Sequence, residues 1–298
     1  MTRGRGRVSC SPSTSFMKLS TTAIALVLIG TATAFASGHG PVFGFATPLN
    51  SKGEFSVDFG MFARNAATGS QFTARSMLSY GLTPHLQISA VMPGLIEQGT
   101  LPMTMMSGGG EFQTNLAWRF QHNPYAVGTR FESTASVGLI VPGPQDNYGM
   151  FRTIRSAPGV NAWGATGLAS RSTYLWIGGG FIHFAERSGD RRPNIISTSA
   201  VYGYRPKAWR SDRLAWDWRI FAEMTGEHMG QMQRGGLPMP GTDANQVFLG
   251  PTALGLYKSF AISGGVQLPI YQDTGTVFPR ERLRAAINVS YFLFSHSH

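Results

Sequence analysis

The sequence predicts an all-β protein, a transmembrane antiparallel β-barrel of about twelve strands. Three observations lead to this fold class. The chain is 42% hydrophobic and 12% aromatic but only 13% charged, and that charged fraction is about half of what soluble domains carry. Apolar and polar residues alternate with a period of two in many segments of roughly nine to twelve residues, the length of a tilted membrane strand. Tight turns and long loops rich in glycine and proline alternate between these segments, as in outer-membrane barrels.

The N-terminal region carries the features of a secretory signal peptide. Lys18 provides a basic flank, Ala23–Ile29 is apolar, and Ala34-Phe35-Ala36 is a small-x-small cleavage site. This order is the one that export requires, and the apolar stretch is too short for a membrane helix. Met17 is an alternative start, and a buried N-terminal strand is the alternative structure. We therefore expect a signal peptide over residues 1–36 of the chain.

The rest of the chain, residues 37–298, is expected to form the barrel. The single cysteine of the sequence, Cys10, lies in the expected leader, so residues 37–298 can form no disulfide. The closed hydrogen bonding of a barrel would have to stabilise this part of the chain instead. The net charge falls from +10 to +6 when the leader takes Arg3, Arg5, Arg7 and Lys18 with it. The sequence has no zinc spacing, P-loop or RNA-binding motif. We expect no nucleic-acid partner and no cofactor.

The strands follow one another between recognisable turns. Tight turns are expected at 81–84, 168–171 and 257–259, and long loops at 94–109, 142–158 and 227–244; the connection at 65–70 is short for an external loop. A soluble sandwich shows the same alternation, but this pattern of connections favours a barrel. The expected strands are 54–64, 71–81, 85–93, 110–120, 129–141, 159–168, 171–184, 194–205, 214–226, 245–257, 259–271 and 281–293.

Aromatic residues gather where the expected strands approach one end of the barrel. With a periplasmic N-terminus this is the periplasmic end, and a belt of aromatic side chains at the lipid interface is typical of membrane barrels. In a sandwich, aromatic residues would favour the strand middles, where they fill the core. The belt is expected to comprise Tyr80, Trp118, Phe120, Tyr174, Trp176, Tyr204, Trp216, Trp218, Tyr257 and Tyr291.

The polar faces of the strands are predicted to line the lumen, while residues such as Leu116 face lipid. Arg282 and Arg284 lie on the polar face of the last strand. Two interpretations stay open: a charged constriction that selects solutes, or a network of paired charges that fills a narrow barrel. The lumen-lining candidates are Asp58, Arg64, Arg75, Glu111, Gln113, Asn115, Arg119, Arg130, Glu132, Asp217, Arg219 and Glu223.

Methionine and histidine cluster in two of the long loops. Thioether and imidazole groups suit copper(I) or silver, but methionine also covers surfaces and fills gaps, and no spacing here specifies a site. The candidates are Met103, Met105, Met106, His228, Met229 and Met232.

A lipid hydrolase built on a barrel is a further alternative. It needs a serine, a base and an orienting group. His85 and His183 are at or near strands and Ser89 is close to His85, but no G-x-S-x-G motif is present. We therefore expect no enzyme.

Three stretches carry a resemblance to a known family. They are Tyr80–Ser89 with its Thr-Pro-x-Leu-Gln core, Gly110–Phe120 with its opening glycine, and Phe248–Pro251 followed by Val266–Tyr271. The chain resembles the MetA-pathway phenol-degradation family of outer-membrane barrels. The resemblance implies a channel for small hydrophobic or aromatic compounds, without binding residues to carry over. The tail Phe294–His298 departs from the aromatic terminal residue that usually closes such barrels.

Taken together, the sequence predicts a channel for passive passage of a small solute through the outer membrane of a Gram-negative bacterium. Its expected partners are outer-membrane lipid, the solute and the outer-membrane assembly machinery. The alternatives are the outer-membrane component of a copper- or silver-handling system, a barrel lipid hydrolase, and a structural barrel whose lumen is blocked.

Overall fold

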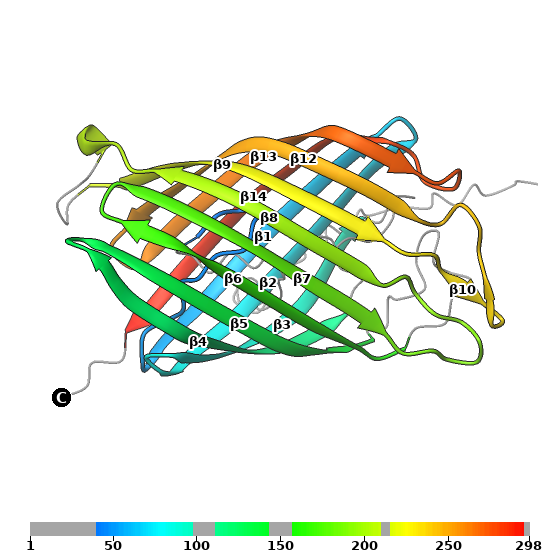
Figure 1. The fold of residues 1–298 in the computed structure, drawn as a ribbon, viewed down its shortest axis with the longest axis horizontal. Helices are drawn as coiled ribbons and strands as arrows, with labels where there is room; N and C mark the ends of the chain where they lie inside the picture. Colours follow the sequence, from blue (N-terminus) through cyan, green and yellow to red (C-terminus); the bar gives the residue numbers. More distant parts are fainter. Residues whose placement is uncertain (1–39, 98–110, 143–156, 210–214, 295–298) are drawn as a thin grey trace, which may run out of the picture.

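The computed structural model is a single closed barrel of twelve antiparallel strands (Figure 1). It describes residues 40–97, 111–142, 157–209 and 215–294. Successive strands pair in the order of the sequence, and β1 pairs with β14 to close the wall. This confirms the predicted fold class. The barrel strands are β1 (Glu54–Ala66), β2 (Gly69–Thr83), β3 (Leu86–Glu97), β4 (Phe112–Ala126), β5 (Thr129–Val141), β6 (Gly159–Ser170), β7 (Thr173–Phe184), β8 (Ile195–Tyr204), β9 (Asp217–Met229), β12 (Ala244–Tyr257), β13 (Phe260–Thr274) and β14 (Glu281–Phe294).

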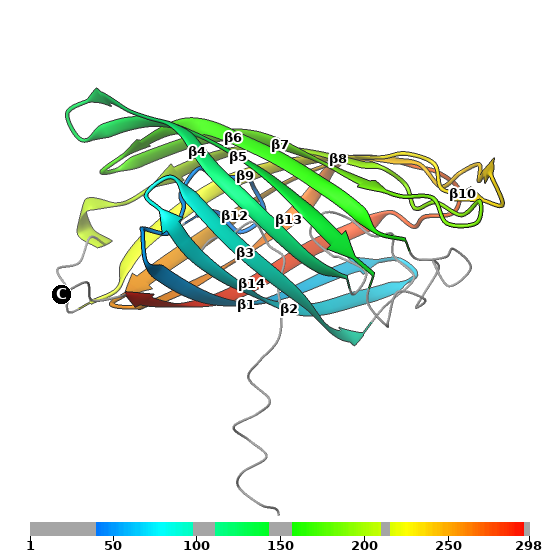
Figure 2. The ribbon, with the colours of Figure 1, turned by 90° about the horizontal axis from the view of Figure 1, so that it is seen from below.

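The two ends of the barrel differ in their connections. At the turn end, where β1 begins and β14 ends, two-residue turns join β2 to β3, β6 to β7 and β12 to β13, as predicted. β4 runs to Ala126, so the β4–β5 turn is shorter than expected. At the opposite loop end lies the small hairpin of β10 (Gln233–Arg234) and β11 (Leu237–Pro238), and Figure 2 shows it far from the end of β14.

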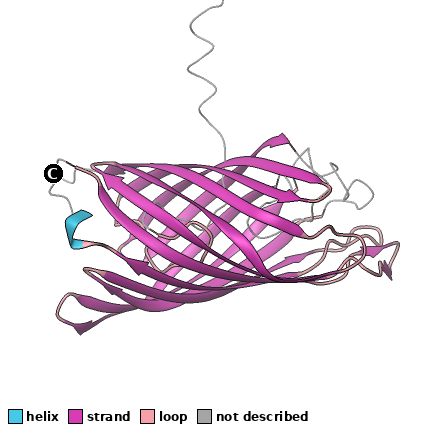
Figure 3. Ribbon diagram, turned by 90° about the horizontal axis from the view of Figure 1, so that it is seen from above, coloured by secondary structure: helices cyan, strands magenta, loops and turns pink. Residues whose placement is uncertain are grey.

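Helical structure is confined to one turn within the described ranges. A 3₁₀ helix, η3 (Lys207–Trp209), lies between β8 and β9 at the turn end (Figure 3). In these ranges no helix is long and apolar enough to span a membrane.

The barrel buries polar side chains and exposes apolar ones, which is the reverse of the distribution in a soluble protein. On β5, Glu132 and Thr134 are fully buried, whereas Val137 and Leu139 are 61% and 60% exposed. The other strands repeat this pattern: buried polar side chains point into the barrel and exposed apolar side chains point outward. An apolar outer wall around a polar interior is the arrangement of a barrel in a membrane.

Two residues of the predicted aromatic belt face the other way. Tyr174 and Trp176 are 8% and 1% exposed and pack with Phe221 inside the barrel. Both faces of β7 are apolar, since Leu175 and Ile177 are exposed on its outer side. The period of two therefore could not decide which face of β7 points inward.

A segment outside the barrel wall occupies the interior. Residues 40–53, which we call the N-terminal segment, precede β1 and are mostly buried; their trace is visible inside the wall in Figure 1. The ring of Phe45 stacks on Trp163 with a centroid distance of 6.0 Å. Val42 and Phe43 pack with Phe62 on β1. The strand pattern could not reveal this segment, because it forms no strand.

Two glycines make room for the segment. A β-carbon at Gly178 of β7 would lie 2.6 Å from Cβ of Phe45, and one at Gly44 would lie 2.4 Å from a methyl group of Val201. Real β-carbons do not approach so closely, so the segment can lie against the wall only because both side chains are absent.

Candidate functional site

The candidate site is the barrel interior and the N-terminal segment within it. Glu223 of β9 is fully buried and binds three successive backbone N–H groups of the segment. Val42 donates to its Oε1 at 2.8 Å, and Phe43 and Gly44 donate to its Oε2 at 2.7 Å each. The hydroxyl of Thr252 on β12 donates a further short hydrogen bond. Hydrogen bonds to a charged group contribute about 1.5–3 kcal/mol each, so this carboxylate is a strong anchor for the segment.

A second carboxylate, on β5, holds another part of the segment; β5 is not adjacent to β9 in the barrel. The hydroxyl of Thr47 donates to Glu132 of β5 at 2.8 Å, and the hydroxyl of Thr134 donates to the backbone carbonyl of Thr47 at 2.8 Å. Glu132 is fully buried. Together with Glu223 it ties the segment to two separate parts of the wall.

Neutral side chains add further contacts along the segment. The backbone N–H of Phe45 donates to Oγ of Ser199 at 2.9 Å, and that of Asn50 donates to the amide oxygen of Gln87 at 2.7 Å. The side-chain amide of Asn50 donates to Ser56. The wall thus provides hydrogen-bond partners for several buried backbone groups of this strand-free segment, and buried backbone groups need such partners.

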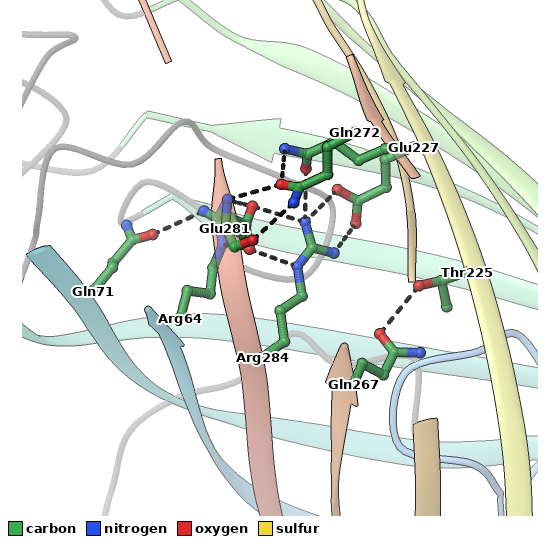
Figure 4. Close-up of polar contacts among 9 residues, drawn as sticks. Arg64, Gln71, Thr225, Glu227, Gln267, Gln272, Glu281 and Arg284 are labelled. Atoms are coloured by element: carbon green, nitrogen blue, oxygen red, sulfur yellow. Dashed lines mark hydrogen bonds and ion pairs between the residues drawn. The ribbon is translucent and has the colours of Figure 1, made fainter. Parts of the chain in front are cut away.

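A network of ion pairs crosses the wall near the loop end (Figure 4). Arg284 of β14 forms a bidentate pair with Glu227 of β9, with N–O distances of 2.8 and 2.9 Å. Its Nε also donates to Glu281 at 2.9 Å, and Arg64 of β1 pairs with the same carboxylate. We call this the loop-end network; its members are Arg64, Gln71, Glu227, Gln246, Gln272, Glu281 and Arg284.

The loop-end network joins strands that are distant in the sequence. Arg64 and Glu281 are separated by 217 positions and meet only because β1 and β14 pair. Arg284 is 2% exposed and also lies over the ring of Phe248, 3.6 Å from its centroid. Buried charges are tolerable when each is paired and hydrogen-bonded in this way.

Sequence reasoning missed most of the loop-end network. Glu227 follows Glu223 and Thr225 on the inward face of β9, but the predicted strand ended at residue 226. Glu281 faces inward because the pairing of β1 with β14 is irregular between Asn65 and Ala66. The same irregularity leaves Arg282 exposed, contrary to its predicted place on the lumen face. Extending the period of two by one residue would have found Glu227.

The turn end holds a group of arginines around two carboxylates. Arg130 approaches Glu132 at 2.9 Å and Arg119 approaches the same carboxylate at 3.5 Å. His122 also contacts Glu132, at 2.9 Å. Asp217 accepts from Arg205 at 2.7 Å and lies 3.6 Å from Arg219. Positive charge therefore exceeds negative charge in this group.

The remaining lumen candidates lie on inward positions of the wall. The hydroxyl of Ser290 donates to Asp58, Arg75 lies over the ring of Phe62, and Glu111 pairs with Arg192. Gln113 and Asn115 are 7% and 8% exposed on β4. Most of the charged candidates thus contact partners within the wall, and the role of the set in solute passage stays a prediction.

Among the metal candidates that the structure describes, His228 is separated from Met229 and Met232. His228 and Met229 are neighbours on β9 and therefore point to opposite sides: His228 is exposed and bonds Asn245, whereas Met229 is buried. Met229 and Met232 belong to a hydrophobic cluster with Phe45 and Phe184. Met103, Met105 and Met106 lie outside the described residues. Among the described residues, no three His, Cys, Asp or Glu side chains could hold a metal ion together.

The residues considered for hydrolysis lie apart in the fold. Ser89 is buried on the inward face of β3, and His85 lies in the exposed turn before that strand. His183 on β7 bonds the side chain of Asn194 at 2.8 Å and stacks with Phe181.

Comparison with solved structures supports the fold. The barrel is similar to the COG4313 outer membrane channel from Pseudomonas putida F1, with a TM-score of 0.57 and 12% identity over 83% of this chain and 97% of that chain. LpxR from Salmonella typhimurium (TM-score 0.43, 11% identity, 80% of this chain and 100% of that chain) and OprD from Pseudomonas aeruginosa (0.40, 8%, 82% and 94%) are less similar. No family model and no curated protein matches the sequence. At these identities the similarity extends to the fold alone.

Proposed function

We propose that the chain is an outer-membrane channel for passive passage of small solutes, including hydrophobic or aromatic ones. The observation that carries this proposal is the inverted polarity of the wall, with exposed apolar side chains outside and buried polar side chains inside. The structural similarity to a protein described as an outer membrane channel supports it. The resemblance of three stretches to the phenol-degradation family supports the hydrophobic or aromatic class of solute.

The N-terminal segment would control passage in this channel. Backbone donors bind Glu223 and a hydroxyl binds Glu132, and residues 40–50 pair with no strand of the wall. The segment can therefore be displaced without breaking the wall. Residues 1–36 would direct export, and the turn end would face the periplasm because β1 begins and β14 ends there.

Solute flux into liposomes tests the channel and its segment together. Glu223→Gln removes the charge that binds three N–H groups and places an amide N–H₂ among them. Because the anchor weakens, liposome swelling with small neutral solutes should become several-fold faster than with the natural chain. Glu227→Gln is the matched control, since Glu227 lies on the same face of β9 but binds Arg284 instead of the segment.

Two outcomes would contradict the proposal, one for the channel and one for the role of the N-terminal segment. A folded barrel that passes no solute, either in its natural form or with Glu223→Gln, would be a blocked structural barrel. Equal acceleration by Glu223→Gln and Glu227→Gln would show that the N-terminal segment does not limit the flux.

A further inference from the structure

A pocket of about 460 Å³ opens inside the turn end and has a composition suited to a ligand. Its walls come from β4, β5, β6, β7 and β9 and from the β6–β7 turn. Arg130, Arg171 and Arg219 line it together with Tyr174. We call it the turn-end basic pocket. It lies beyond the N-terminal segment on the side from which solutes would leave.

The arginines of this pocket are short of carboxylate partners. Glu132 is shared by Arg119, His122 and Arg130, and Asp217 is shared by Arg205 and Arg219. Within the described ranges, Arg171 forms no ion pair. In the described part of the chain, three guanidinium groups line the pocket and no carboxylate does, and a site with excess positive charge surrounded by low-dielectric walls concentrates anions.

Two of these arginines contact neighbouring parts of the pocket. Nε of Arg171 lies against Gly128 in the β4–β5 turn, 3.2 Å from where a β-carbon would stand. The guanidinium of Arg219 lies over the ring of Tyr174, 5.4 Å from its centroid. Because its guanidinium is already positioned by this ring, Arg219 can bind a planar carboxylate with less loss of entropy than a free surface arginine.

Besides its charged and polar side chains, the pocket has an apolar part. Tyr174 is buried and stacks on Trp176 with a centroid distance of 5.3 Å, and Pro124, Ala126 and Ala169 complete the lining. A simple inorganic ion would not use this surface, whereas the body of an organic acid would.

We propose that the turn-end basic pocket binds small organic anions that join a carboxylate to a flat apolar body. This inference rests on the proposed channel function, because it makes the pocket an exit site for anionic solutes. Arg171 and Arg219 would hold the carboxylate, and Tyr174 would contact the apolar body.

Calorimetric titration of the full-length barrel in a non-ionic detergent tests the proposal. Benzoate is the probe, acetate supplies the charge without the ring, and benzyl alcohol supplies the ring without the charge. Benzoate should bind at least tenfold more tightly than either. Arg171→Gln should weaken benzoate about tenfold, because it removes one charge-assisted contact.

Lys258→Gln is the matched control, since it removes one positive charge at the same end, outside the pocket. Equal loss of benzoate affinity in the two variants, or equal affinity for acetate and benzoate, would overturn the proposal. So would the absence of benzoate binding to the folded barrel. Binding is measured independently of flux. A barrel that binds benzoate but passes no solute would therefore contradict the proposed channel function and still support the proposed anion site.

Discussion

Glu281 and Glu223 are both buried carboxylates on the inner wall of the barrel, yet they bind different kinds of partner. Glu281 is held by Arg64 and Arg284, which both belong to the wall. Glu223 is held by three backbone N–H groups of the N-terminal segment and by one wall hydroxyl, and it has no cationic partner among the described residues. The first carboxylate fastens strand to strand, and the second fastens the segment to the wall.

This difference predicts that one carboxylate stabilises the barrel, whereas the other keeps the N-terminal segment inside the lumen. Two charged groups of the wall satisfy each other only in the closed barrel, so their loss should weaken the barrel itself. The hydrogen bonds of Glu223 to backbone N–H groups join the segment, and no strand, to the wall, so their loss should release the segment and leave the wall intact. Variants on each side of the comparison can test this separation.

The largest effect is expected from Arg284→Met. It leaves Glu227 and Glu281 buried with one partner fewer each, and breaking a buried ion pair from one side costs about 3–5 kcal/mol. We expect the free energy of unfolding in urea, measured in detergent, to fall by that amount. Arg282→Met is the control: Arg282 is exposed two residues away, so its loss should change stability little. A similar loss in both variants would mean that the loop-end network does not stabilise the wall.

Gly178→Ala should act on the segment. The new methyl group would lie 2.6 Å from Cβ of Phe45 and 2.8 Å from the backbone oxygen of Gly164 on β6, and overpacking of this kind costs about 1–3 kcal/mol unless a neighbour moves. Because residues 40–50 pair with no strand whereas β6 pairs with β7, we expect the segment to yield first: liposome swelling should become faster, and the free energy of unfolding should fall by less than in Arg284→Met. At Gly164 the nearest atom to a new β-carbon is 3.7 Å away, so Gly164→Ala should leave the swelling rate unchanged. Unaltered flux in Gly178→Ala would place the segment outside the rate-limiting path.

The smallest effect is expected from Ser199→Ala, which removes the single hydrogen bond to the N–H of Phe45. One neutral hydrogen bond contributes about 1 kcal/mol, so swelling should accelerate modestly and less than in Glu223→Gln. Ser197 lies on the same inward face of β8, and its hydroxyl has no partner in the described part of the chain. Ser197→Ala should therefore match the natural chain, and a response equal to that of Ser199→Ala would contradict the assignment.

The sequence by itself determined the strands and most of their faces. The strand at residues 129–141 was predicted with its observed bounds, and Leu116 and Gln113 face outward and inward as expected. These features are local: a period of two fixes which side chains share a face, and turn residues fix where a strand ends. Where both faces were apolar, as around Trp176, the period gave no direction.

Only the tertiary structure decided what fills the barrel and which charges meet. The N-terminal segment has no periodic pattern, and its place depends on Glu223 and Glu132, which are 180 and 85 positions away from Phe43 and Thr47. The pairing of Arg64 with Glu281 depends on closure of the wall between β1 and β14. Such contacts are set by how many strands close the barrel and how they are staggered, because these two quantities bring distant residues to the same level of the lumen.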